Sequence, residues 1–283
     1  MADWQLQGFD LDAFVSATLA EDLGTIGDIT SAGVIPADAI FHGEMASRDA
    51  IAVAGLPIAA AFFRALDPDA TIDMLVEDGA RVAAGTPLMR IKGKARALLT
   101  AERSALNTLQ HLSGVATLTA SHVDAIAGTG AIMLDTRKTI PGLRLLEKYA
   151  VRMGGGTNHR MGLWDAAMIK DNHVAVAGGV DEAVRRAKAA GIERIMVEVD
   201  RIDQITPALN AGATWLLLDN MPPPVLREAV AMVAGRVPTE ASGGVRLDTI
   251  RAIAETGVTY ISAGRLTQSA PAADIGLDLA IVG

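Results

Sequence analysis

Short runs of apolar residues recur through the second half of the chain, each followed by a polar turn. Runs this short and this uniformly apolar are typical of strands buried on both faces of a parallel sheet. Helical patterns, such as 180–190 and 224–233, lie between consecutive runs, as in compact strand–helix units. We therefore predict an α/β fold whose strands lie at 132–134, 167–169, 195–197, 215–218, 260–262 and, more weakly, 237–239.

The first part of the chain follows a different pattern, in which short strand-like segments alternate with turns. Segments 76–82 and 88–91 flank Gly-Thr-Pro at 85–87, a composition that favours a turn between strands. From Leu98 the apolar residues recur at helical spacing, with Thr100 as the expected N-cap. An α+β region is therefore expected before the strand–helix units.

Composition excludes several classes of protein. The 283 residues are 50% hydrophobic and 20% charged, which is ordinary for a globular fold. No cysteine is present, which excludes disulfides, thiolate nucleophiles and cysteine metal ligands. Residues 1–4 do not resemble a secretory signal, and the longest apolar stretch, 51–63, is shorter than the ~20 residues of a membrane span. We expect a soluble, cytoplasmic protein that contacts no membrane.

The distribution of charge points to an anionic ligand. The formal net charge is −8, which disfavours nucleic acid as a partner. Residues 131–170 nevertheless contain seven Lys or Arg and three Asp or Glu, a net +4, so the rest of the chain carries −12. A cationic segment in an acidic protein favours an anion site. The alternative is a set of surface charges that folding separates, and charge alone leaves both interpretations open.

Charged or glycine-rich residues end every predicted strand. In β/α barrels the active site is assembled at the carboxyl ends of the strands. One charged strand end means little because strand ends are exposed, but six in succession favour a shared rim around one site. The strand ends are Asp135-Thr136-Arg137-Lys138, Lys170-Asp171-Asn172-His173, Glu198, Asp219-Asn220, Glu240-Ala241-Ser242-Gly243-Gly244 and Ala263-Gly264-Arg265.

The last two strand ends are typical of phosphate sites. The loops after the last two strands of a barrel usually hold the phosphate, and bare glycine amides before a helix favour an anion. A helix is expected to begin near residue 247, directly after the first of these loops. Plain tight turns are the alternative. The two loops are Ser242-Gly243-Gly244 and Ala263-Gly264-Arg265.

Other nucleotide-binding patterns are absent from the sequence. No Gly-x-Gly-x-x-Gly follows a strand and there is no Walker A loop, which disfavours a dinucleotide-binding or P-loop domain. A Gly-x-Ser-x-Gly motif and a zinc-type histidine cluster are also absent. The chemistry therefore needs no enzyme nucleophile, and electrostatic stabilisation of a charge-separated transition state would suffice.

The rim combines several cations with two acids. Arginine suits bidentate contacts to carboxylate or phosphate, whereas lysine acts as a point charge. Glu198 and Asp219 would face Mg²⁺ or ribose hydroxyls at a phosphate site, or else pair with a rim lysine. The cations are Arg137, Lys138, Arg160 and Lys170, with His159 beside Arg160.

Several motifs, in order along nearly the whole chain, resemble quinolinate phosphoribosyltransferase, a family also called nicotinate-nucleotide pyrophosphorylase (carboxylating). The central block is long and specific, and shorter matches lie on both sides of it. The central motifs are Asp135-Thr136-Arg137-Lys138-Thr139-x-Pro141-Gly142-Leu143-Arg144, Glu147-Lys148-Tyr149-Ala150-Val151, Gly154-Gly155-Gly156-x-Asn158-His159-Arg160 and Ile169-Lys170-Asp171-Asn172-His173. The flanking ones are Glu21-Asp22, Gly27-Asp28-Ile29-Thr30-Ser31, Glu102-Arg103-x-Ala105-Leu106-Asn107, Leu218-Asp219-Asn220-Met221 and Glu240-Ala241-Ser242-Gly243-Gly244.

The resemblance implies a reaction and an architecture. Quinolinate and phosphoribosyl pyrophosphate would give nicotinate mononucleotide, pyrophosphate and CO₂ with Mg²⁺, a step of de novo NAD biosynthesis. An N-terminal α/β sandwich domain would span 1–105, with the C-terminal segment 266–283 packed on it. An incomplete, seven-stranded α/β barrel would span 106–265. The family implies at least a homodimer with shared active sites, and the sequence leaves dimer or hexamer open.

The resemblance also implies roles for individual residues. Arg103 would reach the quinolinate carboxylates across the subunit interface. Glu198 and Asp219 would face the ribose hydroxyls and the metal. Lys138 and Lys170 would lie beside the carboxylates and pyrophosphate, and with the two acids they form the expected catalytic set. Quinolinate would also contact Thr136, Arg137, His159 and Arg160, and phosphate would contact Ser242, Gly243, Gly244, Ala263, Gly264 and Arg265.

Two other functions are compatible with parts of this pattern. A sister group of pyrophosphorylase-like proteins accompanies molybdate transport with the same fold and a different acceptor. The intact segment Lys170-Asp171-Asn172-His173 argues against it, because that group departs from the pattern there. A catalytically silent binding protein would need a lost rim residue, and every expected one is present.

Overall fold

The computed structural model describes residues 5–279, which form two compact units. Within this range, unit 1 comprises residues 5–118, 141–155 and 269–279, and unit 2 comprises residues 119–140 and 156–268. The first four residues, on which the expectation of no secretory signal rests, and the last four lie outside the described range.

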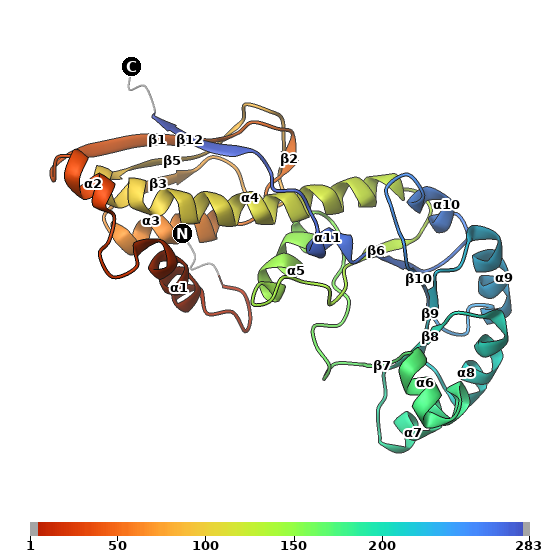
Figure 1. Cartoon of the computed structure of the whole chain (residues 1–283). Coiled ribbons are helices and arrows are strands. Elements are labelled where there is room, and N and C mark those ends of the chain that lie inside the picture. The colour runs from red at the N-terminus through yellow and green to blue at the C-terminus, as the bar shows by residue number, and fades with distance from the viewer. Residues whose placement is uncertain (1–4, 280–283) are drawn as a thin grey trace. The chain divides into compact units, whose positions relative to one another are not determined.

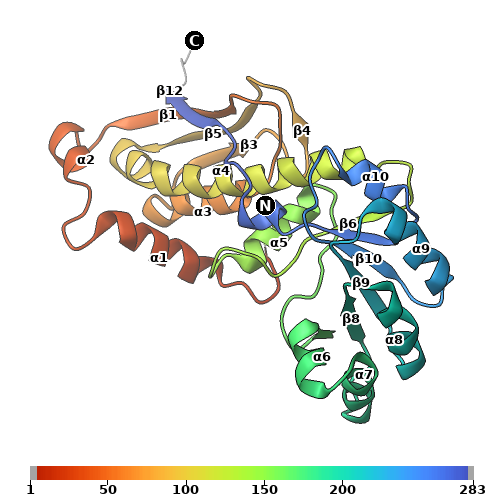
Figure 2. The same cartoon turned by 45° about the vertical axis from the view of Figure 1, so that its right-hand side comes forward.

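Unit 1 is an antiparallel sheet covered by helices. Its strands are β1 (Ile40–Ser47), β2 (Ile51–Ala52), β3 (Thr71–Met74), β4 (Arg81–Val82), β5 (Pro87–Lys94) and β12 (Ile275–Leu279), and its helices are α1 (Leu11–Leu23), α2 (Ile29–Val34), α3 (Leu56–Leu66), α4 (Ala95–Ala125, which continues into unit 2) and α5 (Arg144–Met153). The main sheet has the order β12-β1-β5-β3, and α3 and α4 run along one face of it (Figures 1 and 2). This arrangement confirms the N-terminal sheet-and-helix domain.

Alternation of side chains explains how this sheet buries one face. On β5, Met89 and Ile91 are buried on either side of the exposed Arg90, whose Nε lies 2.8 Å from Oε2 of Glu44 on β1. Leu88 is also buried, at an irregularity in the pairing of β5 with β1. On α3, Phe62 and Phe63 are fully buried. These apolar side chains make the core of unit 1, because a helix and a sheet face bury the most apolar area when they cover each other.

The C-terminal segment belongs to unit 1. Strand β12 pairs antiparallel with β1, and Nε2 of Gln110 on α4 donates a hydrogen bond of 2.6 Å to the carbonyl of Ile275. The chain crosses α4 at Gly114, where a Cβ atom would lie 2.0 Å from the carbonyl oxygen of Pro271. Glycine is therefore required at this crossing.

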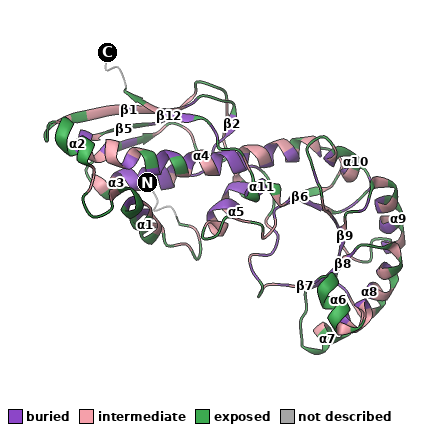
Figure 3. Ribbon diagram, in the orientation of Figure 1, coloured by how far each residue is buried: buried purple, intermediate pink, exposed green. Residues whose placement is uncertain are grey.

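Unit 2 is a parallel sheet with helices outside it. Its strands are β6 (Ile132–Leu134), β7 (Ala167–Ile169), β8 (Ile195–Val199), β9 (Trp215–Asp219), β10 (Thr239–Ser242) and β11 (Tyr260–Ser262), and its helices are α6 (Asp171–Ala177), α7 (Val180–Ala189), the 3₁₀ helix η1 (Ile202–Gln204), α8 (Ile205–Ala211), α9 (Pro223–Val233), α10 (Ile250–Ala254) and α11 (Arg265–Gln268). The strand order is β6-β11-β10-β9-β8-β7. Burial shows why the helices pack: on α9, Leu226, Ala229 and Val233 are buried at helical spacing and the opposite face is exposed (Figure 3).

The parallel sheet confirms the predicted α/β class. All six predicted strands form, and the weak one moves from 237–239 to β10, because Pro238 has no N–H for the ladder. A single parallel bridge between Thr157 and Leu134 adds a seventh position at the free edge of β6. Within residues 5–279 the barrel is thus open, with six strands and one bridging residue.

The start of α4 differs from the prediction. The helix begins at Ala95, so Thr100 lies inside it and is not its N-cap. The Thr100 hydroxyl donates hydrogen bonds to the Arg96 carbonyl (2.7 Å) and to Oδ2 of Asp28 (2.8 Å). The domain boundary expected at residues 105 and 106 falls within this helix. No helix of the described residues is long and apolar enough to cross a membrane.

Asp28 gives a testable contribution to stability. Its carboxylate caps α2, and hydrogen bonds from Ser31, followed by the one from Thr100, lower its pKa from 3.8 to about 2. Replacing Asp28 with alanine should lower the free energy of unfolding at neutral pH by about 1 kcal/mol. Because the folded-state pKa lies below the unfolded one, this contribution is present above pH ~4 and is lost as the pH falls toward 2. Urea unfolding of the wild type and of Asp28→Ala at neutral pH and near pH 2 measures this contribution. An equal difference in unfolding free energy at the two pH values would contradict the assignment.

Candidate active site

The predicted rim residues of unit 2 come together because the strands are parallel. Neighbouring strands from β6 to β7 run in the same direction and in register, so their carboxyl ends lie at one edge. Lys138 follows β6, Lys170 follows β7, Glu198 lies in β8 and Asp219 ends β9. Of the site residues predicted from the sequence, only Arg103, on α4, belongs to unit 1.

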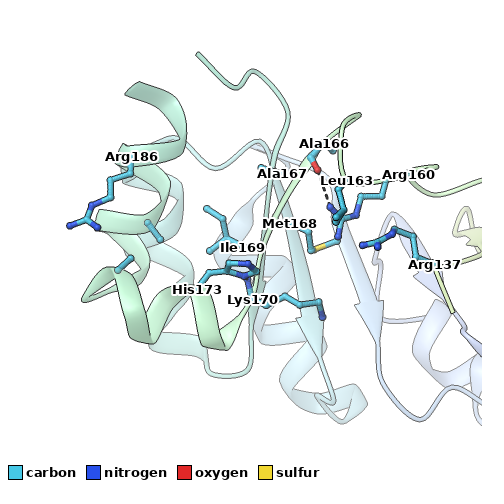
Figure 4. Close-up of a pocket in the computed structure, with 12 residues that line it drawn as sticks. Arg137, Arg160, Leu163, Ala166, Ala167, Met168, Ile169, Lys170, His173 and Arg186 are labelled. Atoms are coloured by element: carbon cyan, nitrogen blue, oxygen red, sulfur yellow. Dashed lines mark hydrogen bonds between the residues drawn. The ribbon is translucent and has the colours of Figure 1, made fainter. Parts of the chain in front are cut away.

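A cavity of about 490 Å³ holds the arginines of this rim. Arg137, Arg160 and Lys170 point their charged ends to the same side of β7, next to the side chain of Met168 (Figure 4). Arg186 lies at the opposite end and points away. The volume suits a small organic ligand, and the lining combines a few charges with apolar side chains. The apolar lining residues, including Leu163 and Met168, were not predicted from the sequence.

The two arginines place two positive charges in one cavity. Arg160 is only 9% exposed, and its Nη1 donates a hydrogen bond of 2.9 Å to the carbonyl of Ala166. Burial lowers the pKa of Arg160, and the positive charge of Arg137 lowers it further, whereas Asp165 raises it. Two neighbouring cations with restricted access to water favour a ligand that carries two negative charges.

Two acids and a lysine form a second cluster beside the cavity. Nζ of Lys170 lies 2.5 Å from Oε2 of Glu198. Burial raises the pKa of Asp219 and the charge of Glu198 raises it further, whereas Lys170, a hydrogen bond from Asn220 and Lys138 lower it. The predicted alternative, a lysine–acid pair, therefore forms between Lys170 and Glu198. The mutual influence of these charges places both acids and both lysines around one volume.

Lys138 lies against the second predicted phosphate loop. A Cβ atom at Gly264 would come within 2.6 Å of Cδ of Lys138. The hydroxyl of Thr267 donates a hydrogen bond of 2.7 Å to the carbonyl of Lys138, and the backbone N–H of Lys138 donates one of 3.0 Å to the hydroxyl of Thr136. The turn after β6 is thus fixed from both sides, with the lysine next to the loop Ala263-Gly264-Arg265.

The first phosphate loop depends on glycine at residue 243. Gly243 has φ +92°, and a Cβ atom there would lie 2.1 Å from Oδ1 of Asn220. Ser242 holds the neighbouring loop, because its carbonyl accepts a hydrogen bond of 2.8 Å from the backbone N–H of Asn220. The helix expected near residue 247 begins only at Ile250 and is five residues long, because residues 247–249 form a separate turn, where Asp248 pairs with Arg246.

His159 is buried and is not one of the residues that line the cavity. Its Nε2 is 3.1 Å from Oε2 of Glu240, and its Nδ1 accepts a hydrogen bond of 2.7 Å from the backbone N–H of Arg160. Its own backbone N–H donates to Oδ1 of the fully buried Asp135 at 2.8 Å. The sequence placed His159 on the substrate, and only the tertiary contacts reveal its link to Glu240.

Two family models match almost the whole chain. The model for the quinolinate phosphoribosyl transferase N-terminal domain matches residues 28–113, and the model for the C-terminal domain matches residues 115–278.

Individual relatives agree with this match over most of their lengths. The chain is 45% identical over 274 residues to the nicotinate-nucleotide pyrophosphorylase (carboxylating) of Mycobacterium leprae, covering 94% of this chain and 95% of the relative. It is 40% identical over 291 residues to a quinolinate phosphoribosyltransferase (decarboxylating) of Nicotiana tabacum, covering 96% of this chain and 83% of the relative.

Solved structures show the same fold. The nicotinate-nucleotide pyrophosphorylase of Francisella tularensis is similar with a TM-score of 0.91 and 39% identity, covering 98% of this chain and 99% of that one. The same enzyme of Ehrlichia chaffeensis gives a TM-score of 0.92 and 36% identity, covering 97% of this chain and 100% of that one.

Proposed function

The chain belongs to the quinolinate phosphoribosyltransferase family, and from this membership we propose how its site carries out the reaction of that family. The phosphoribosyl group of phosphoribosyl pyrophosphate is transferred to quinolinate with decarboxylation, which gives nicotinate mononucleotide, pyrophosphate and CO₂ for NAD biosynthesis. The match supports this activity rather than the alternative in molybdate transport. The observation that carries the proposal is the pair of arginines, Arg137 and Arg160, in one cavity with Lys170.

Quinolinate is itself the nucleophile. The bond between the anomeric carbon and pyrophosphate breaks through an oxocarbenium-like state, and the pyridine nitrogen donates its electron pair to that carbon. The ring nitrogen is then cationic, so it stabilises the electron pair that stays on the adjacent ring carbon as CO₂ leaves, and that carbon takes up a proton. The protein must orient two carboxylates and balance charge, which agrees with a chain that contains no cysteine.

The cations divide between the two substrates. Arg137 and Arg160 bind the quinolinate carboxylates, because guanidinium groups match carboxylates in geometry and charge. Lys170 lies between this cavity and the acid pair, so it contacts the acceptor and the ribose side of the donor. Lys138, beside Gly264, neutralises the departing pyrophosphate, with Thr136 holding its turn. The 5′-phosphate occupies the loops Ser242-Gly243-Gly244 and Ala263-Gly264-Arg265.

Glu198 and Asp219 bind the ribose hydroxyls and a hydrated Mg²⁺. Among the described residues, no group of three or more His, Asp or Glu is placed to hold a metal. Two adjacent carboxylates fit an ion that arrives with its phosphates and keeps several water ligands, as Mg²⁺ does. The bound ion would neutralise the pyrophosphate charge. Glu198 and Asp219 would hold the hydrated ion and orient the ribose.

The ionisation of Asp219 predicts a pH effect. The hydrogen bond of 2.6 Å from Nδ2 of Asn220 stabilises its carboxylate. Replacing Asn220, whose φ is 54°, with glycine removes this bond without backbone strain. The pKa of Asp219 should rise, so the active ionised form should be lost at a higher pH as the solution is acidified. The acid limb of kcat/KM for phosphoribosyl pyrophosphate measures this, and a shift toward lower pH would contradict the proposed role.

A single assay tests the reaction. The protein is incubated with Mg²⁺, phosphoribosyl pyrophosphate and either quinolinate or nicotinate, and the nucleotide product is identified by mass. The expected result is nicotinate mononucleotide from quinolinate and no product from nicotinate, because the two arginines bind two carboxylates and nicotinate has only one. No product from either acceptor would refute the proposed function and favour the sister group with another acceptor.

The oligomeric state and location are proposed as well. We propose a homodimer in which Arg103 of one subunit completes the quinolinate site of the other. Mixing inactive Arg103→Ala and Lys170→Ala subunits should then restore activity, since hybrid dimers contain one intact site. Unchanged inactivity after confirmed subunit exchange would contradict the shared site. The expected cytoplasmic location remains a proposal, which fractionation of cells that express the tagged chain would test.

A further inference from the structure

A buried polar triad is joined to the backbone of Arg160, which lines the cavity. It consists of Glu240 on β10, which is fully buried, with His159 and Trp215. Oε2 of Glu240 accepts a hydrogen bond of 2.8 Å from Nε1 of Trp215 and lies 3.1 Å from Nε2 of His159. Oε1 of Glu240 has no hydrogen-bond partner among the described residues. A buried carboxylate that is only half satisfied costs stability, so its presence in the core calls for a functional reason.

The contacts of His159 determine which ring nitrogen carries the proton. Nδ1 accepts the backbone N–H of Arg160, so it carries no proton itself. The ring proton therefore lies on Nε2 and is donated to Glu240. Both ring nitrogens are engaged within the protein. His159 thus acts on the substrate indirectly, through the backbone of the neighbouring arginine.

That backbone lies at the free edge of the parallel sheet, beside β6. Thr157 forms a single bridge with β6, and Asp135 accepts hydrogen bonds from the His159 N–H (2.8 Å) and from Nδ2 of Asn158 (2.6 Å). In the order of the sheet, β11 separates β6 from β10. The hydrogen bond from His159 to Glu240 therefore ties the edge segment across the barrel interior to a central strand.

We propose that Glu240 is a positioning residue for quinolinate, which acts through His159 to fix the orientation of Arg160. The proposal rests on the proposed function, since it concerns the acceptor half of the same site. Arg160 is held on its other side by the bond from Nη1 to the carbonyl of Ala166. Loss of the Glu240 acceptor frees the imidazole, and the backbone N–H of Arg160 then loses its fixed partner. The guanidinium consequently binds the carboxylate in a less favourable geometry.

Three variants separate this role from core packing, with quinolinate binding measured by calorimetry. Glu240→Met fills a similar volume without an acceptor and should weaken quinolinate binding by about tenfold or more. Glu240→Gln keeps an acceptor oxygen and should bind within about threefold of the wild type. Trp215→Phe removes the other donor of the same triad and should lower stability while quinolinate affinity stays within about threefold. Phosphoribosyl pyrophosphate binding should be unchanged in all three.

The outcomes distinguish the positioning role from the proposed function. Wild-type affinity in folded Glu240→Met, or equal weakening by Trp215→Phe, would overturn the role of Glu240 and leave the proposed function intact. A wild-type protein that binds no quinolinate would overturn both. If Glu240→Met fails to fold, the ring ¹⁵N chemical shifts of the wild-type protein report the tautomer of His159. The His159 signal is identified as the one that disappears in His159→Gln. The Nε2–H tautomer is expected, and an Nδ1–H tautomer or an imidazolium overturns the proposal.

Discussion

Replacing Arg160 with alanine is expected to lower kcat/KM for quinolinate by roughly 30- to 5,000-fold, the equivalent of the 2–5 kcal/mol lost when one partner of a buried charge pair is removed. Arg160 is 9% exposed, and its pKa is lowered by burial first and by the charge of Arg137 second, so a ligand carboxylate would offset the cost of burying this cation. The variant leaves one quinolinate carboxylate desolvated and unpaired. Steady-state kinetics with each substrate varied in turn should show little change in KM for phosphoribosyl pyrophosphate.

Arg186→Ala is the matched control for this variant. Arg186 also lines the cavity, but it points away from the arginine pair, its side chain is 64% exposed, and its Nε donates a hydrogen bond of 2.8 Å to Glu182 (Figure 4). An exposed ion pair on a helix contributes little, so activity should stay within about twofold. Equal losses from Arg160→Ala and Arg186→Ala would show that the cavity is sensitive to any change, and would refute a specific carboxylate contact.

Replacing Gly243 with alanine is expected to lower kcat/KM for phosphoribosyl pyrophosphate by about tenfold or more, because backbone strain of about 1–3 kcal/mol must be relieved by moving the loop. The residue has φ +92°, and the new Cβ would lie 2.1 Å from Oδ1 of Asn220 and 2.9 Å from its backbone nitrogen. A backbone atom cannot yield as a flexible side chain can. The loop would therefore move away from the phosphate, and Asn220 would move with it.

Comparison with Gly244→Ala separates the steric clash at Gly243 from the strain of a positive φ. Gly244 also has a positive φ, +58°, but a Cβ atom there meets no described atom within 4 Å. Its cost is limited to the backbone conformation, about 1 kcal/mol, and the kinetic effect should be correspondingly smaller. Thermal unfolding of both variants checks that each is folded. A larger kinetic loss in Gly244→Ala than in Gly243→Ala would contradict the proposed geometry of the phosphate loop.

Local patterns were sufficient to predict much of the fold. Five of the strands in unit 2 start at the predicted residue, because runs such as 132–134 and 260–262 are bounded by polar turns on both sides. The strand that follows Pro238 and the helix that follows Gly244 were misplaced. Both lie where proline or glycine interrupts the pattern, so the boundary depends on hydrogen bonds to neighbouring segments.

The beginning of α4 was misplaced for a related reason. Thr100 has the composition of an N-cap, but inside the helix its hydroxyl donates to Arg96 and to Asp28, a residue 72 positions away in the sequence. The helix can therefore start at Ala95, directly after β5. A hydrogen bond between residues so far apart leaves no local signal, so the propensity of a single residue was overridden by a tertiary contact.

The sequence by itself determined which residue types stand at the strand ends, because the apolar period and the charges that interrupt it are local properties of the chain. It also determined the family, through motifs that are continuous in the sequence. Only the tertiary structure decided which of these residues meet. Packing brought Arg137 and Arg160 into one cavity, joined Lys170 to Glu198, and placed His159 beside Glu240. Such contacts depend on side-chain direction and burial across distant strands, and these are fixed only when the core is assembled.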